Sequence, residues 1–278
     1  MIAINHDLHV HTYLSACCGD KENQIPEKIL VVAEELGLDT IGFSDHIWTN
    51  PQVEPSGWYL PQDERQIIRL RSDLASLSSP VRVLVGCEAD TIAPGKFSIT
   101  QEFASSLDYV GLSCSHFHMK KLVQQPKDDS PRSVGEHLMT FFVSAIKSGL
   151  ATIIVHPFLP LGYKNQYDDI IAALSDAELS DAFSVAAEQN VALEITTAFF
   201  PSIEKENGPA VSMWSIETPS RVLSLAKAVG CKFSFGSDAH SLERMKQLPE
   251  LEIFSKHLDL KKEDMVPITR ACPKRGRE

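Results

Sequence analysis

Short apolar runs of strand length recur along this chain and alternate with longer segments whose apolar residues have helical spacing. The strand-like runs lie just before Asp7 and at 39–44, 81–86, 108–115, 151–155, 191–196 and 231–237. The helical segments lie at 26–38, 62–77, 98–106, 133–149, 179–190 and 218–230. Such alternation is typical of βα units around a parallel sheet. Seven strands with crossovers predict a closed or nearly closed barrel rather than an open sheet.

No linker-like change in composition and no internal repeat divides the 278 residues. Barrels of this length are commonly one unit, so we expect a single domain over 1–278. The irregular segments 47–61 and 119–131 contain Pro, Gly, Trp, Lys and Asp, and we expect them to form loops over one end of the barrel.

Composition narrows the class of protein. Hydrophobic residues make up 43% and charged residues 23%, as in ordinary soluble globular proteins. We expect a cytoplasmic protein without a membrane span, because the start has no signal-like pattern and no apolar run is long enough. The six cysteines are too sparse for a disulfide scaffold, which indicates reduced thiols. The net charge of −11 makes nucleic acid an unlikely partner, and the short basic tail at 272–278 is interpreted as a solvated terminus.

Metal-binding residue types follow each predicted strand, and all carboxyl ends of parallel barrel strands lie on one face. In chain order these residues are His9, His11, Asp45, His46, Glu88, His116, His118, His156, Glu194, Asp238 and His240. Seven of the ten histidines belong to this set. Imidazole and carboxylate suit zinc, iron or manganese, and a carboxylate such as Glu88 or Asp238 can bridge two ions. The pattern therefore predicts a metal site.

Three other histidines are interpreted as structural. His137 lies in a helical segment, and His257 lies in a polar helix near the end of the chain. His6 has the wrong strand parity to point with His9 and His11, which alternate on one face.

With these residues in view, the sequence resembles the PHP family, the polymerase and histidinol phosphatase domain of metal-dependent phosphoesterases. The matching motifs are DLHVHT, GFSDH, GCEAD, SCSHFH, VHP and GSDAH, in that order. They span about residues 6–240 and leave a C-terminal extension at 241–278. The resemblance implies an α/β fold, a distorted (β/α)7 TIM-like barrel, with three metals at its C-terminal face.

The resemblance also implies a set of ligands. His9, His11, Glu88 and Asp238 would hold the first metal, and Glu88 would bridge to a second one bound by His116 and His156. His46 and His240 would hold a third, completed from the loop after the first motif. Cys17 stands where the family often has a histidine or carboxylate, and a thiolate would favour zinc or iron over manganese. Cys17 is the favoured ligand, with Asp20 or water as the alternative, and Cys18 is expected to point elsewhere.

The predicted chemistry is hydrolysis of a small phosphate ester, most favourably a phosphomonoester as in a histidinol phosphatase, by a hydroxide bridging two or three divalent ions. His240 or His118 is a candidate proton donor, although His118 could instead replace His116 as a ligand. Asp7, Asp45 and Glu194 are candidates for orienting imidazoles. Candidate phosphate contacts are Lys120, Lys121, Lys164 and Arg244, although a solvated cation is the favoured interpretation of any one of them. Trp48, Trp58 and Tyr59 could stack on a flat leaving group or pack within their loop.

Three other functions stay open at this level. An amidohydrolase would also place an HxH motif on the first strand, but no strand-end lysine offers a metal bridge here. A nuclease of the same family is disfavoured by the acidic balance. A non-enzymatic metal-binding module would have no reason to keep nine ligand-type residues.

Overall fold

The computed structural model describes residues 2–200, 203–204 and 211–267. The strands are β1 (His6–Val10), β2 (Thr40–Phe43), β3 (Arg82–Val85), β4 (Glu88–Ala93), β5 (Lys96–Phe97), β6 (Gly111–Ser113), β7 (Ile153–Val155), β8 (Ala192–Thr196), β9 (Ile203–Glu204), β10 (Val211–Ser212) and β11 (Phe233–Gly236). The basic tail and the end of the predicted extension lie outside the described residues.

The helices match the predicted segments, with shifted ends and several short additions. They are α1 (Pro26–Glu35), α2 (Glu64–Leu74), α3 (Gln101–Ala104), α4 (Pro131–Lys147), α5 (Tyr167–Ala172), α6 (Asp176–Gln189), α7 (Glu217–Ala228), α8 (Leu242–Met245) and α9 (Glu252–His257). The 3-10 turns are Lys164–Gln166, Thr197–Phe199, Leu248–Leu251 and Lys262–Asp264. Within the described ranges, none of these helices is both long enough and apolar enough to cross a membrane.

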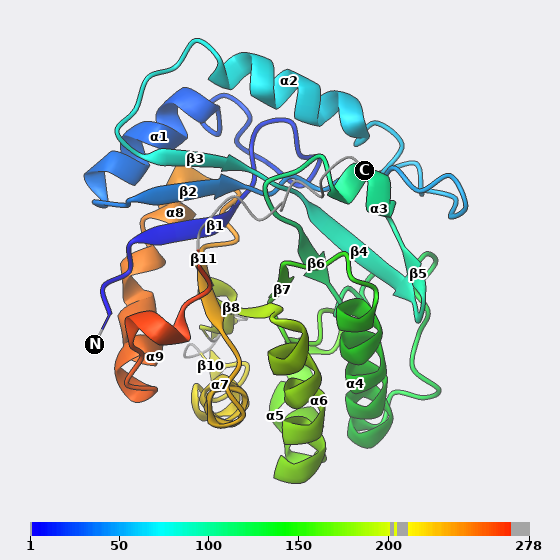
Figure 1. The fold of residues 1–278 in the computed structure, drawn as a ribbon. Helices are drawn as coiled ribbons and strands as arrows, with labels where there is room; N and C mark the ends of the chain where they lie inside the picture. The colour runs from blue at the N-terminus through cyan, green and yellow to red at the C-terminus, as the bar shows by residue number, and fades with distance from the viewer. Residues whose placement is uncertain (1, 201–202, 205–210, 268–278) are drawn as a thin grey trace, which may run out of the picture.

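The α/β fold class predicted from the sequence is confirmed. One parallel sheet has the order β1-β2-β3, and a second has the order β11-β8-β7-β6-β4-β5, parallel except for the β4–β5 pair. A parallel bridge from Val10 to Ala239 places β1 beside β11, and β3 continues into β4 through Gly86 and Cys87 (Figure 1). The strands thus follow one another around a distorted ring. The seven predicted positions are β1, β2, β3 with β4, β6, β7, β8 and β11.

The first strand differs from the prediction, which placed it before Asp7. β1 runs from His6 to Val10, because its polar side chains find partners inside the fold. The imidazole Nε2 of His6 accepts the Phe235 backbone N–H at 3.0 Å, and Asp7 Oδ1 accepts that of Ser237 at 2.9 Å. A polar strand is stable when its buried groups are paired in this way.

A register shift in β1 also changes which way its residues face. Asp7 pairs with Ile41 and Val10 with Phe43, so β1 advances one residue more than β2 between these pairs. Such a bulge re-aims the side chains that follow it. The parity argument that separated His6 from His9 therefore does not hold across this strand, although the structural role assigned to His6 agrees with its bond to Phe235.

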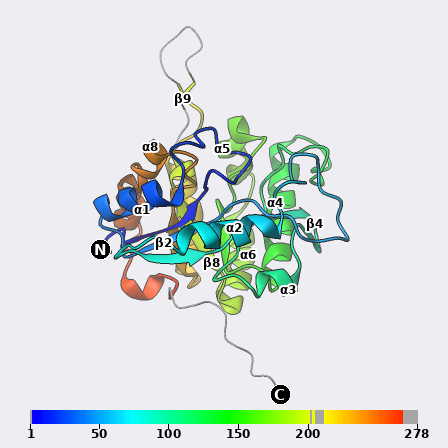
Figure 2. The ribbon, with the colours of Figure 1, turned by 90° about the horizontal axis from the view of Figure 1, so that it is seen from above.

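Helices cover the outside of the strands. Helices α4, α5, α6 and α7 pack on one another along the β4–β8 side, whereas α1 and α2 pack together beside β2 and β3 (Figures 1 and 2). A small separate cluster of buried residues comes mainly from the strands: Leu8, Leu84, Tyr109, Ile153, Val155 and Ala192. Tyr109 fits because Gly42 and Gly86 lack side chains; a Cβ on either would come within 2.8 Å of its ring. The helices and this cluster hold the strand ends in place.

Candidate metal centre

Within the described ranges, the carboxyl ends of the strands bring three groups of donor side chains together. The first is His9, His11, Glu88 and Asp238, the second is Glu88, His116 and His156, and the third is His11, Cys17 and His46. Within each group one donor atom per residue lies within 4.8 Å of the others. Glu88 belongs to the first two groups and His11 to the first and third, so the three groups are contiguous.

Glu88 sits at the middle of the centre, buried at the start of β4. Its Oε2 atom lies 3.3 Å from the Nε2 atoms of His9 and His11 and 3.4 Å from that of His46. Its Oε1 atom faces the other way, 2.9 Å from His156 Nε2 and 3.4 Å from His116 Nε2. The two oxygens therefore face different sets of imidazoles, as expected of a carboxylate that bridges two ions.

Metal ions fit this arrangement better than internal hydrogen bonds do. The Nε2 atoms of His9 and His11 lie 3.2 Å apart, and both also face Asp238 Oδ1, at 3.5 and 3.3 Å. Only a protonated nitrogen can donate, so two imidazoles and two carboxylates converging on one point leave lone pairs directed at the same space. In addition, His46 Nδ1 is buried without a hydrogen-bond partner in the described part of the chain. Neutral imidazoles and carboxylates converging in this way form the donor set of zinc, iron and manganese.

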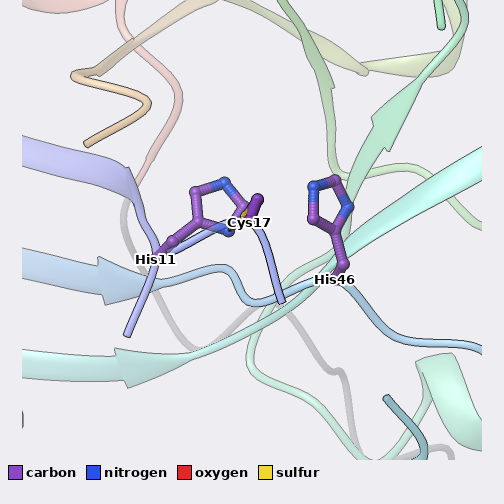
Figure 3. A group of neighbouring side chains, drawn as sticks. All are labelled: His11, Cys17 and His46. Carbon is purple, nitrogen blue, oxygen red and sulfur yellow. Dashed lines mark hydrogen bonds between the residues drawn. The ribbon is translucent and has the colours of Figure 1, made fainter. Parts of the chain in front are cut away.

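The third group contains the cysteine singled out from the sequence (Figure 3). Cys17 Sγ lies 3.8 Å from His11 Nδ1 and 3.1 Å from Ser15 Oγ. Burial raises the pKa of the Cys17 thiol, but the neighbouring His11 more than offsets this and lowers it to about 3. This lowered pKa favours the thiolate, the form that binds metal.

His240 was expected to share the third metal with His46, and this stays a prediction. Among the described residues it belongs to none of the three groups, but it lies close enough to Cys17, as His11 and His46 do, to lower the pKa of that thiol. The His240 ring stacks on that of His11 with centroids 4.2 Å apart, and its Nδ1 lies 2.9 Å from the Asp238 carbonyl oxygen. Cys18 is buried and directs its thiol to the His240 carbonyl, and Asp20 accepts from the Asn23 amide.

A second layer of side chains holds the outer nitrogens of the imidazoles. His9 Nδ1 lies 2.7 Å from Glu194 Oε1, His116 Nδ1 lies 2.5 Å from Asp90 Oδ1, and His156 Nδ1 lies 3.0 Å from Ser115 Oγ. Such contacts fix the ring and leave the other nitrogen free for a metal. The expectation for Glu194 therefore agrees with its contacts.

Asp7 and Asp45 accept hydrogen bonds from backbone N–H groups and a hydroxyl rather than from imidazoles, which differs from the expectation. Asp7 Oδ1 accepts the His9 backbone N–H at 3.1 Å. Asp45 accepts both the backbone N–H and the hydroxyl of Thr12, each at 2.6 Å. Sequence reasoning missed Asp90, although it lies two residues after Glu88 in the GCEAD motif and therefore on the same strand face.

Backbone strain is present at two of the metal-binding candidates. His156 has a φ of 33° and Asp238 a φ of 51°, values that residues other than glycine seldom adopt. Both residues follow the end of a strand, and the His156 N–H donates to Glu194 Oε2 at 2.6 Å. Strain of this kind persists where surrounding contacts impose it, and it concentrates at functional sites.

The imidazoles of the centre lower the pKa values of its carboxylates. Burial raises the pKa of Glu88, but His46 and His9 outweigh it and hold the pKa well below its usual range. The pKa of Asp238 is lowered in the same way by His9 and His11. These shifts favour the anionic forms of the two carboxylates, the forms that a cation site requires.

A pocket of about 780 Å³ opens onto the centre. Its wall includes residues from every group and is otherwise formed by Ser56, Trp58, Tyr59, His118, Met119, Lys120, Lys121, Leu122, Leu161 and His240. His118, Lys120 and Lys121 are exposed there, whereas Lys164 and Arg244 are outside the wall. Trp48 is buried and donates to the Val53 carbonyl at 2.8 Å, so it packs within its loop.

A parallel α/β fold with histidines and carboxylates gathered at the strand ends defines a class of metal-binding barrel-like proteins, and within it this chain belongs to the PHP domain family. The family model matches residues 7–198. A protein of Aliivibrio fischeri named a probable phosphatase is 27% identical over 249 residues, covering 90% of this chain and 83% of that protein.

Two solved structures share the fold at low sequence identity. One is histidinol phosphate phosphatase from Lactococcus lactis, in complex with zinc, L-histidinol and phosphate. It is 17% identical, with a TM-score of 0.55 and coverage of 95% of each chain. The other, from Listeria monocytogenes, is provisionally named a histidinol phosphatase; it is 14% identical, with a TM-score of 0.60 and coverage of 86% of this chain and 97% of that one.

Proposed function

We propose that this protein hydrolyses a small phosphate monoester with two or three divalent ions of zinc, iron or manganese held at the strand ends. The broader class, a metal-dependent hydrolase that acts on phosphate esters, follows from membership of the PHP family and from the phosphatase relative. Histidinol phosphate is the first substrate to test, because the similar Lactococcus fold is complexed with zinc, L-histidinol and phosphate.

The observation that carries the proposal is the position of Glu88. Its two oxygens face separate sets of imidazoles, and His11 and Asp238 complete the set on the Oε2 side. His9, His11, Glu88 and Asp238 would hold one ion, and Glu88, His116 and His156 a second. Bound there, divalent ions make water a stronger nucleophile and offset negative charge on the phosphate oxygens.

The pocket side chains have roles around the reacting phosphate. His240 lies on the pocket wall, with Nδ1 next to the Asp238 carbonyl and its ring against His11, and this position supports a role as the donor of the proton that the leaving oxygen needs. His118 would contact the substrate. The exposed Lys120 and Lys121 at the rim would attract an anionic substrate to a protein whose net charge is −11.

A third ion would be held by His11, Cys17 and His46. The thiolate makes this group the softest of the three, so it should favour zinc or iron over manganese. Because Cys17 also lines the pocket, an ion there would lie within reach of the substrate phosphate.

The test combines metal content with a substrate panel. The protein is purified without chelator, and its metals are counted by mass spectrometry. Turnover is then measured on three kinds of substrate: phosphomonoesters including histidinol phosphate, phosphodiesters including single-stranded DNA, and amides. His11→Ala should abolish phosphomonoester turnover while the protein stays folded, and His257→Ala, a histidine outside the centre, should retain it.

Either of two results would overturn the proposal. One is retained turnover in His11→Ala. The other is a wild-type protein, loaded with each metal, that cleaves only diesters, only amides or nothing in the panel.

A further inference from the structure

Asp90 is a buried carboxylate that lies next to the centre without facing it. It follows Glu88 by two residues on β4, and its exposed fraction is 0%. Its Oδ1 atom lies 2.5 Å from His116 Nδ1, and its Oδ2 atom accepts the Tyr59 hydroxyl at 2.5 Å. Each oxygen thus has one strong donor, and both donors belong to residues at the pocket.

We propose that Asp90 is a positioning residue for the second ion, and that Tyr59 holds Asp90 in place. This inference rests on the proposed metal centre. A carboxylate accepts but cannot donate, so His116 Nδ1 must carry the proton. The lone pair is then confined to Nε2, the atom that lies 3.4 Å from Glu88 Oε1. Asp90 selects the tautomer that can bind metal and prevents the ring from flipping.

Tyr59 extends this network to the wall of the pocket. Its buried ring lies edge-on to that of Trp58, with centroids 4.6 Å apart, and Trp58 in turn lies edge-on to His46 at 5.3 Å. The Tyr59 hydroxyl is therefore a direct link between the segment that carries Trp58 and the carboxylate behind His116. Metal binding at His116 and ordering of this wall should favour each other.

Asp90 offers a cleaner test than the other outer partners. Glu194 contacts His9 and also accepts the His156 backbone N–H, so a change there would disturb two parts of the centre. By contrast, within the described ranges the Asp90 carboxylate makes hydrogen bonds with His116 and Tyr59.

The experiment measures zinc binding to full-length metal-free protein by competition with a chelating dye. Asp90→Asn keeps the shape of the side chain but loses its charge, and we expect zinc affinity for one ion to fall about 10- to 100-fold. Tyr59→Phe should weaken the same ion by a smaller factor. Asp168→Asn is the matched control. Asp168 is not part of the pocket wall, and its carboxylate accepts the Ser215 N–H at a distance of 2.9 Å.

The outcomes separate this inference from the proposed function. Wild-type zinc affinity in Asp90→Asn would refute the positioning role, and so would an equal loss in Asp168→Asn, which would indicate general destabilisation. If Asp90→Asn weakens zinc but wild-type protein turns over no phosphate ester, the positioning role stands and the proposed function fails. If the wild type turns over a phosphate ester but Asp90→Asn keeps the wild-type zinc affinity, the proposed function stands and the positioning role fails.

Discussion

Gly236, the last residue of β11, is predicted to be irreplaceable because of the side chains around it. A Cβ at this position would overlap Glu194 Oε1 and would lie 2.8 Å from both Glu194 Cδ and His9 Cβ. All of these atoms are buried, so none can move into solvent. Gly236→Ala must therefore push Glu194 away from His9 or shift the strand.

The cost can be worked out from the bonds involved. Glu194 accepts from His9 Nδ1 at 2.7 Å and from the His156 N–H at 2.6 Å. Hydrogen bonds to a charged group contribute about 1.5–3 kcal/mol each. If the strand shifts instead, overpacking costs about 1–3 kcal/mol. We expect a loss of about 3 kcal/mol, which lowers Tm by roughly 6 to 12 °C at about 2–4 °C per kcal/mol.

The assay is thermal unfolding of metal-free protein, followed by zinc titration. Gly57→Ala is the matched control, since a Cβ there has no neighbour within 4 Å, and it should leave both Tm and zinc binding unchanged. Gly236→Ala should lower Tm and weaken zinc at the group that contains His9. A variant with the wild-type Tm and full zinc affinity would refute the reasoning.

Three further predictions concern other parts of the molecule. Burial lowers the pKa of His6 to about 4, and its Nε2 already accepts an N–H, so the fold resists protonation of this ring. The folded-state pKa of His6 lies below the ordinary 6.5. The stability that the neutral ring contributes is therefore fully present above pH 6.5 and is lost as the pH falls toward 4. From pH 7 to pH 5 the wild type should lose about 2 kcal/mol more than His6→Gln in urea unfolding, and equal losses would contradict this. Tyr109→Phe removes a hydroxyl bonded to Ser44 Oγ at 2.6 Å and should cost about 1–3 kcal/mol in the same assay, with no loss counting against the packing described. Cys17→Ser should reduce the zinc or iron bound per chain; unchanged metal content and activity would show that Cys17 is not a ligand.

The candidate ligands could be found from the sequence because of a simple geometric rule. Parallel strands end on one face, so His9, Glu88, His116 and Asp238 could be predicted to meet although they are far apart along the chain. The structure brings all four into the first two of the three groups. This inference does not depend on exact strand boundaries. It therefore holds although the first strand covers His6–Val10 rather than the residues before Asp7.

Details that depend on distances between different strands could not be predicted. The bulge in β1 adds one residue relative to β2, so the alternation of side chains between the two faces of the strand cannot be counted across it. Which histidines lie beside Cys17 depends on the path of a loop, and the structure groups this cysteine with His11 and His46. The role of Asp90 depends on where His116 and Tyr59 place their polar atoms.

The sequence alone therefore determined the α/β class, the end of the barrel at which metal-binding residues gather, and the family to which they point, because hydrophobic periodicity and residue type are local properties. Only the tertiary structure decided how the donors divide into groups, which carboxylates orient imidazoles, and why Gly236 must lack a side chain. These depend on contacts of a few ångströms between segments up to 230 residues apart, such as Ser237 and Asp7, and no local pattern encodes such distances.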